Sequence, residues 1–148
     1  MRTVDDLIAS KPRPENIIKP EALVIDALHL LEQVNLSYLI VMDGDTAQAR
    51  YKGVFSEKDY SRNVVLKGRS SKEAHVQEVM TTDLPVVGPG ETVENCMILM
   101  IRSKARYLVA MDEKKFMGII TIHDILREVL ANREEVFDNS LTEKLIDT

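Results

Sequence analysis

The stretch PEALVIDALHLLEQVNLSYLIVMD, Pro20 to Asp43, decides the fold because the chain contains it twice. A shift of 69 residues lays it without gaps over PGETVENCMILMIRSKARYLVAMD, Pro89 to Asp112, and seven of the 24 positions are identical. Ordinary composition would give about one or two identities. A second block, GVFSEKDYSRNVV from Gly53, lies over GIITIHDILREVL from Gly118 at a shift of 65. The chain is therefore a tandem repeat whose first copy carries four more residues between its blocks.

Each copy shows the same order of apolar patterns. A short apolar segment, Ile17-Ile18 or Val86-Val87, precedes apolar residues at the three- and four-residue steps of a helix. Two runs of strand length then follow across a polar connection, which is typical of an antiparallel hairpin, and a second helical pattern ends the copy. The sequence predicts an α/β fold, with mixed sheets of the α+β kind, built from two βαββα repeats. The later strands and helices are expected at Tyr38–Met42, Gly53–Phe55 and Glu57–Leu66, and at Tyr107–Met111, Phe116–Ile120 and Ile122–Arg133.

Short helices are also expected outside the repeats. Thr3-Val4-Asp5-Asp6 has the form of a capping box, and the prolines that follow end the helix that it starts. Ala74 to Met80 is the matching helix before the second copy, and Ser140 with Glu143 forms a capping box for a C-terminal helix. The polar stretch Lys67 to Lys72 separates the copies. The expected domains are residues 1–68, with the N-terminal helix, and residues 69–148, with the linker helix and the C-terminal helix.

Composition excludes several classes of protein. The 148 residues include 24 acidic and 19 basic side chains, for a net charge of −5, and 45% are hydrophobic, which is typical of a soluble globular chain. The longest apolar run, Cys96 to Ile101, is far shorter than the roughly 18 residues of a membrane-spanning helix, and Asp5 and Asp6 disfavour a signal peptide. The lone cysteine fits a reducing compartment. We expect a cytoplasmic protein that binds neither membrane nor nucleic acid.

Both copies carry one polar motif in apolar surroundings, GVFSEKD in the first and GIITIHD in the second. In each, a hydroxyl and a carboxylate stand three residues apart: Ser56 and Asp59, then Thr121 and Asp124. One interpretation is structural, because this spacing caps the start of a helix. The other is functional, because a helix N-terminus offers donors for a phosphate and a carboxylate accepts both hydroxyls of a ribose. Both interpretations stay open from spacing alone.

With these motifs the chain resembles a tandem pair of CBS domains, the βαββα modules named after cystathionine β-synthase. The two G-h-h-[ST]-x-x-D motifs, the Val76–Thr81 lead into the second copy and the Pro-Gly-Glu-Thr-Val helix start carry the resemblance, which extends from about Val4 to Leu130. The chain is most similar to small stand-alone CBS-pair proteins of bacteria and organelles. The resemblance implies two domains packed about a pseudo-twofold axis. It also implies two clefts for adenosine-containing ligands such as AMP, ADP, ATP, NAD(H) or S-adenosylmethionine.

The resemblance further implies which groups contact the ligand. The motif carboxylates hold the ribose, the motif hydroxyls help to place the ribose or a phosphate, and the main chain of each first strand meets the adenine edge. Basic residues beside the motif or before the hairpin are candidates for a phosphate contact, with a solvated helix face as the alternative. The expected ligand-binding residues are Ile17, Ile18, Ser56, Lys58, Asp59, Val86, Val87, Arg106, Thr121, His123 and Asp124.

The two copies depart differently from the family pattern. The segment Lys11 to Asn16 contains no Met-Thr pair like Met80-Thr81, and the first hairpin is longer, at Gly44 to Arg50. We therefore expect the two clefts to bind unequally, with the second motif as the better match. Arg127 lies one helical turn beyond Asp124, and this spacing is typical of a helix-surface ion pair.

Catalytic and metal-binding patterns are missing from the sequence. Cys96 aligns with Ala27 on an apolar helix face, and neither His29 nor His75 has a converging ligand, so we expect no enzyme, no catalytic cofactor and no metal. The leading hypothesis is a regulatory module that binds an adenine nucleotide and changes the surface it presents to an unidentified effector protein. The alternative is a ligand-independent dimeric scaffold or regulatory subunit. A homodimer is expected because four apolar residues form rows on exposed helices: Val64, Val65, Val129 and Leu130.

Overall fold

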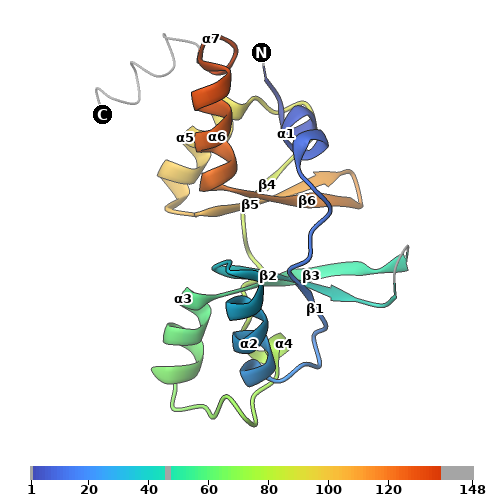
Figure 1. Cartoon of the computed structure of the whole chain (residues 1–148), viewed down its shortest axis with the longest axis vertical. Helices are drawn as coiled ribbons and strands as arrows, with labels where there is room; N and C mark the ends of the chain where they lie inside the picture. Colours follow the sequence, from blue (N-terminus) through green and yellow to red (C-terminus); the bar gives the residue numbers. More distant parts are fainter. Residues whose placement is uncertain (1, 46–47, 138–148) are drawn as a thin grey trace. The chain divides into compact units, whose positions relative to one another are not determined.

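The computed structural model describes residues 2–45 and 48–137, which form two compact units (Figure 1). The first-repeat unit runs from Arg13 to Asp83, and the second-repeat unit joins the residues up to Pro12 to those from Leu84 onward. Each unit holds one three-stranded sheet and carries its helices on one face of that sheet. Each repeat therefore builds a hydrophobic core of its own.

The first-repeat unit has the predicted βαββα order. Strand β1 runs parallel to β2, and β2 runs antiparallel to β3, so the sheet order is β1-β2-β3. The helix that follows β3 begins as α-helix and continues as a π-helix, η2. The elements are β1 (Ile17–Ile18), α2 (Val24–Val34), β2 (Tyr38–Asp43), β3 (Arg50–Ser56), α3 (Glu57–Asp59), η2 (Tyr60–Val65) and α4 (Val76–Val79).

The second-repeat unit repeats this topology. Its sheet order is β4-β5-β6, again with one parallel and one antiparallel pair. The register repeats as well, because Ile17 pairs with Ile40 in the first sheet and Val86 with Val109 in the second. The predicted class, two βαββα repeats with mixed sheets, is confirmed. The elements are α1 (Val4–Ser10), β4 (Val86–Val87), α5 (Val93–Ser103), β5 (Tyr107–Asp112), β6 (Lys115–Thr121), α6 (Ile122–Ala131) and α7 (Arg133–Val136).

The connections within the repeats follow from local sequence. Helices α2 and α5 end at residues in the left-handed conformation, Asn35 (φ 55°) and Lys104 (φ 53°), which turn the chain into the next strand. Six residues, 44–49, join β2 to β3, whereas two, 113–114, join β5 to β6. The difference of six minus two equals the four extra residues found by self-comparison.

The two short helices pack in a different grouping from the expected domains 1–68 and 69–148. Helix α1 belongs to the second-repeat unit, where Val4 and Leu7 join the core and Arg2 forms two bonds to Glu128 of α6, at 3.0 and 3.2 Å. Helix α4 belongs to the first-repeat unit, where Val76 and Val79 join its core. Each unit therefore buries one short helix from outside its repeated blocks. Helix α1 precedes the first repeat but packs in the second-repeat unit, and α4 lies between the repeats and packs in the first-repeat unit.

Some predicted boundaries and exposures are wrong. Helix α6 ends at Ala131 instead of Arg133, because Asn132 leaves the helical conformation (φ −139°, ψ 46°). Val64 is 1% exposed and belongs to the core, since η2 turns it toward the sheet, while Val65 and Leu130 are 54% and 77% exposed. The predicted capping box at Ser140 and Glu143 lies outside the described residues. In the described part of the chain, every helix is too short or too polar to span a membrane.

Candidate functional site

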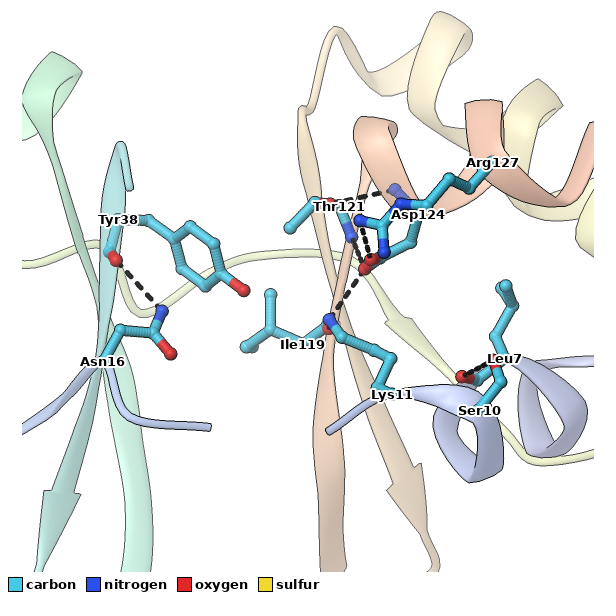
Figure 2. A network of polar contacts seen from close by, with 9 residues as sticks. All are labelled: Leu7, Ser10, Lys11, Asn16, Tyr38, Ile119, Thr121, Asp124 and Arg127. Carbon is cyan, nitrogen blue, oxygen red and sulfur yellow. Dashed lines mark hydrogen bonds and ion pairs between the residues drawn. The ribbon is translucent and has the colours of Figure 1, made fainter. Parts of the chain in front are cut away.

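The second motif builds a buried carboxylate at the start of α6 (Figure 2). Thr121 ends β6 and caps α6: its Oγ1 accepts from the Asp124 backbone N–H at 3.2 Å, while Asp124 Oδ2 accepts from the Thr121 N–H at 2.8 Å. The hydroxyl and carboxylate thus form the capping box that their spacing predicts. Asp124 is only 5% exposed, so the motif also places a charged group in the protein interior.

Lys11 reaches this carboxylate from the segment that follows α1. Its Nζ lies 2.7 Å from Asp124 Oδ2 and 2.7 Å from the carbonyl oxygen of Ile119 (Figure 2). The Lys11 side chain is 24% exposed and that of Asp124 is 4% exposed. A buried carboxylate needs such a partner, because an unpaired charge in the interior is strongly unfavourable.

Arg127 makes a weaker contact with the other carboxylate oxygen. Its Nη2 lies 3.3 Å from Asp124 Oδ1, and its side chain is 70% exposed. This confirms the ion pair that the spacing along the helix predicts. Among the described residues, Asp124 Oδ2 therefore accepts two short bonds and Oδ1 accepts one long bond. Since each carboxylate oxygen can accept about two hydrogen bonds, Oδ1 keeps spare acceptor capacity.

The first motif forms the same capping box but is satisfied differently. Asp59 Oδ2 accepts from the backbone N–H and the hydroxyl of Ser56, at 2.9 and 3.1 Å. Asp59 Oδ1 accepts from the Thr81 hydroxyl at 2.6 Å and from Asn63 Nδ2 at 3.4 Å. Four donors thus occupy the Asp59 carboxylate, and all four are neutral.

Two crossing segments, Met80–Thr81 beside β3 of the first sheet and Lys11–Pro12 beside β6 of the second, explain this difference. Thr81 exchanges backbone hydrogen bonds with Val54 of β3, at 2.8 and 2.9 Å, close to the motif. The repeat shifts of 69 and 65 residues align Thr81 with Pro12 and Val54 with Ile119. Proline has no backbone N–H to donate. In the second-repeat unit the Lys11 ammonium takes over the bond to the strand carbonyl, and it replaces the hydroxyl on the motif carboxylate as well.

A glycine lets the first crossing segment approach its sheet. A Cβ atom at Gly53 would lie 2.6 Å from the Thr81 carbonyl oxygen and 3.0 Å from the Met80 sulfur. The family-like pair Met80-Thr81 therefore serves the first motif, although it stands directly before the second repeat. The prediction that Met80 and Thr81 improve the second motif is wrong, because both residues belong to the first-repeat unit and Thr81 pairs with Val54 there.

The other predicted site residues lie at the edges of the motifs. Lys58 and His123 are exposed in the first turns of their helices, and Arg106 is exposed while its carbonyl accepts from the Ile122 N–H at 3.2 Å. The first strands differ within each pair: Ile17 and Val86 are 44% and 63% exposed, Val87 is buried and Ile18 is half-buried. The structure thus brings Thr121 to Asp124 and Ser56 to Asp59, and the ligand contacts of all eleven residues stay predictions.

Sequence reasoning missed Lys11, Thr81 and Asn63 as partners of the motif carboxylates. For Lys11 and Thr81 no local signal existed, because they reach the carboxylates through the packing of α1 and α4 on the sheets. For Asn63 a signal existed, since it stands four residues after Asp59 in a predicted helix, where side chains at this spacing are neighbours.

The described residues offer no centre for metal or thiol chemistry. Within residues 2–45 and 48–137, no three His, Cys, Asp or Glu side chains gather in a way that could hold a metal ion. Cys96 is buried in the core of the second-repeat unit, and burial raises the pKa of its thiol to about 12. The thiol therefore stays protonated at neutral pH, as expected of a structural cysteine.

Two βαββα repeats, each with a hydroxyl–carboxylate capping box after its last strand, define a tandem βαββα module. The model of the CBS domain matches residues 4–65 and 76–131, so the chain belongs to the CBS-domain family. The resemblance inferred from the motifs is confirmed.

The chain is similar to several known proteins with CBS domains. The mitochondrial CBS domain-containing protein CBSX3 of Arabidopsis thaliana is 30% identical over 141 residues, which cover 90% of this chain and 68% of CBSX3. A solved CBS-domain protein from Burkholderia ambifaria has 34% sequence identity and a TM-score of 0.76, covering 93% of this chain and 98% of its own. The crystal structure of CBSX2 in complex with AMP has 28% identity and a TM-score of 0.71, covering 90% and 100%.

Proposed function

We propose that this CBS pair is a regulatory module that binds an adenosine-containing ligand at the Asp124 carboxylate and modulates a partner protein. The observation that carries the proposal is the uneven use of the two carboxylate oxygens. The Thr121 N–H and Lys11 hold Oδ2, whereas Oδ1 meets Arg127 at 3.3 Å as its one contact within the described residues. A buried carboxylate with a free acceptor suits a ribose hydroxyl.

The surroundings of Asp124 favour a nucleotide over a simple sugar. Helix α6 begins at this motif with ten residues, and a helix N-terminus attracts a phosphate. The Thr121 Oγ1 accepts from the Asp124 N–H, which leaves its hydroxyl hydrogen available to donate. The AMP in the related CBSX2 structure supports this ligand class. The proposed ligands of this class are AMP, ADP, ATP and NAD(H), with adenosine as the neutral member for comparison.

The role in regulation rests on membership of the CBS-domain family. The motif carboxylates are engaged in capping boxes, and the one cysteine is buried with a raised pKa. We therefore propose a binding module without an enzyme activity or a catalytic cofactor. Its output would be a change in the surface that it offers to an effector protein.

A ligand panel tests the proposal directly. The full chain is melted in urea with and without adenosine, AMP, ATP and NADH, and binding is measured by isothermal titration. A ligand present at 100 times its dissociation constant adds about 2.7 kcal/mol to the free energy of unfolding. If none of the four stabilises the chain at millimolar concentration, the ligand-independent scaffold becomes the better account.

We also propose a homodimer. Exposed apolar side chains lie at the end of η2 and along α6: Val65 and Leu66, the residue after η2, are 54% and 78% exposed, and Leu126 and Leu130 are 52% and 77% exposed. Apolar side chains grouped in this way mark protein interfaces. Sedimentation at micromolar concentration tests the dimer, which a purely monomeric species with and without nucleotide would contradict.

A further inference from the structure

We propose that Lys11 sets the charge preference of the Asp124 site, so that the site selects phosphorylated adenosine ligands over neutral adenosine. This inference rests on the proposed function and adds a residue from outside the motif to the ligand site. Its basis is the position of the Lys11 ammonium, 2.7 Å from Asp124 Oδ2, where the other repeat has the neutral hydroxyl of Thr81.

The charges around the two motif carboxylates are opposite in sum. Asp124 contacts two cations, Lys11 at 2.7 Å and Arg127 at 3.3 Å. Asp59 contacts only neutral donors, from Ser56, Asn63 and Thr81. The Asp59 carboxylate with its neutral donors therefore carries a formal charge of −1, and the Asp124 carboxylate with its two cations carries +1. A ribose held at either carboxylate brings its phosphates nearby, so the Asp59 cluster repels them and the Asp124 cluster attracts them.

Lys11 can assist a phosphate without leaving its present partners. A lysine ammonium has three N–H groups. Two of them are accounted for by the Ile119 carbonyl and by Asp124 Oδ2, both at 2.7 Å. The side chain is 24% exposed, so the third N–H can meet solvent or a ligand. Because the ammonium is already anchored, a phosphate that binds it does not have to immobilise a free lysine side chain.

Proline at position 12 explains why the charge lies at this site. In the first-repeat unit the crossing segment uses the Thr81 N–H for the strand and its hydroxyl for the carboxylate. Pro12 offers neither group, and the preceding Lys11 supplies both bonds from one charged nitrogen. The missing backbone N–H of Pro12 is thus replaced by the Lys11 ammonium, and only the second repeat has this cation beside its motif.

Neutral and conservative variants of Lys11 separate charge from position. We choose Lys11→Gln, which keeps a side-chain donor without the charge, and Lys11→Arg, which keeps the charge. Lys67→Met, in the exposed linker, controls for the change in net charge of the whole chain. Dissociation constants for adenosine, AMP and ATP are measured by isothermal titration of the full chain at fixed salt, and urea melts report whether each variant is folded.

We expect Lys11→Gln to weaken ATP binding by roughly tenfold or more and adenosine binding by less than about threefold. Lys11→Arg and Lys67→Met should keep the preference of the parent protein for ATP over adenosine. An equal loss for all three ligands would overturn the inference, because Lys11 would then only position the carboxylate. Tighter binding of all three would also overturn it, since Lys11 would compete with the ribose.

Failure of the proposed function gives a different result. In that case the parent protein itself binds none of the three ligands, and no comparison of variants arises. If Lys11→Gln does not fold, Lys11→Met replaces it, because methionine is a neutral side chain of similar length: Lys11→Met should weaken ATP binding and leave adenosine binding within about threefold. An unchanged ratio of ATP to adenosine affinity in folded Lys11→Met would overturn the inference.

Discussion

The two repeats share one fold but satisfy their motif carboxylates with different chemistry. Thr81 gives the first repeat a backbone N–H and a hydroxyl, and Lys11 gives the second a single ammonium. The geometry of both capping boxes is the same, with backbone bonds of 2.9 and 2.8 Å to the carboxylate. The comparison teaches that a fold can keep a hydrogen-bonding requirement while its charge changes, and that binding preference can follow the charge.

The helices that start at the motifs differ as well. Helix α6 is regular, whereas α3 passes into the π-helix η2, in which the Leu66 N–H bonds to the Ser61 carbonyl at 3.1 Å. In this helix Asn63 donates both to Asp59, at 3.4 Å, and to the Val79 carbonyl of α4, at 3.0 Å. The first carboxylate is thereby tied to the linker helix, which adds to its structural role.

The largest expected effect is a loss of nucleotide affinity when the Asp124 carboxylate becomes an amide, and the same change at Asp59 is its matched control. Asp124→Asn should weaken nucleotide binding by about ten- to a hundredfold, which corresponds to about 1.5–3 kcal/mol for hydrogen bonds to a charged group. The matched Asp59→Asn should change the affinity by less than about twofold, because neutral donors already fill its oxygens. Isothermal titration with AMP and ATP checks both variants.

These two variants also differ in their effect on stability. Asp124→Asn leaves the Lys11 ammonium without its carboxylate, so we expect the free energy of unfolding to fall by about 1–3 kcal/mol. Equal losses of nucleotide affinity in Asp59→Asn and Asp124→Asn would contradict the proposal that the two carboxylates contribute unequally to binding. An unchanged affinity in Asp124→Asn would remove the site assignment altogether.

The second expected effect concerns the close approach of the first crossing segment. Gly53→Ala puts a Cβ atom 2.6 Å from the Thr81 carbonyl oxygen. This oxygen accepts from the Val54 backbone N–H, so it cannot move away without disturbing that hydrogen bond. We expect a loss of about 1–3 kcal/mol in the free energy of unfolding, as for other overpacked sites. Gly88→Ala is the control, because nothing lies within 4 Å of a Cβ there. Similar urea midpoints for both variants would contradict the close contact.

Much of this fold could be predicted because the repeat fixes it. The identities between Pro20–Asp43 and Pro89–Asp112 place α2, β2, α5 and β5, and the second repeated block places the ends of β3 and β6 with the helices that follow. The four extra residues fall in the hairpin where the shift changes. The capping boxes at Ser56–Asp59 and Thr121–Asp124 follow from spacing alone. Local patterns of this kind carry their own geometry, and so the sequence is a sufficient guide to them.

The partners of the carboxylates could not be predicted in the same way. Lys11 and Asp124 are far apart in sequence and meet because α1 packs on the second repeat, a contact between apolar faces that no local pattern specifies. The same holds for Thr81 and Asp59, which meet because α4 packs on the first. Val64 is likewise buried by its packing in the core of the first-repeat unit.

The third expected effect isolates the neutral partner of Asp59. Thr81→Val removes the hydroxyl that donates to Oδ1 at 2.6 Å while keeping the shape of the side chain. We expect the free energy of unfolding to fall by about 1–2 kcal/mol, because a buried acceptor loses a short bond. Nucleotide affinity should stay the same if Asp59 is structural. Thr82→Val, one residue further and exposed, is the matched control.

The smallest expected effect belongs to Arg127. Its ion pair with Asp124 is long, at 3.3 Å, and its side chain is 70% exposed, so solvent screens most of the attraction. Arg127→Met should therefore change the free energy of unfolding by less than about 0.5 kcal/mol. Arg62→Met, at the aligned position of the first repeat, should give a similar small value.

The Arg127 variant also sharpens the view of the two cations at Asp124. If Lys11 sets the charge preference, Arg127→Met should lower ATP affinity by no more than about threefold, well below the effect of Lys11→Gln. Titration of both variants with ATP and adenosine at the same salt concentration makes the comparison. A larger loss of ATP affinity in Arg127→Met than in Lys11→Gln would shift the phosphate contact to the exposed arginine. The difference between the repeats would then no longer stem from Pro12, because both repeats carry an arginine at this position.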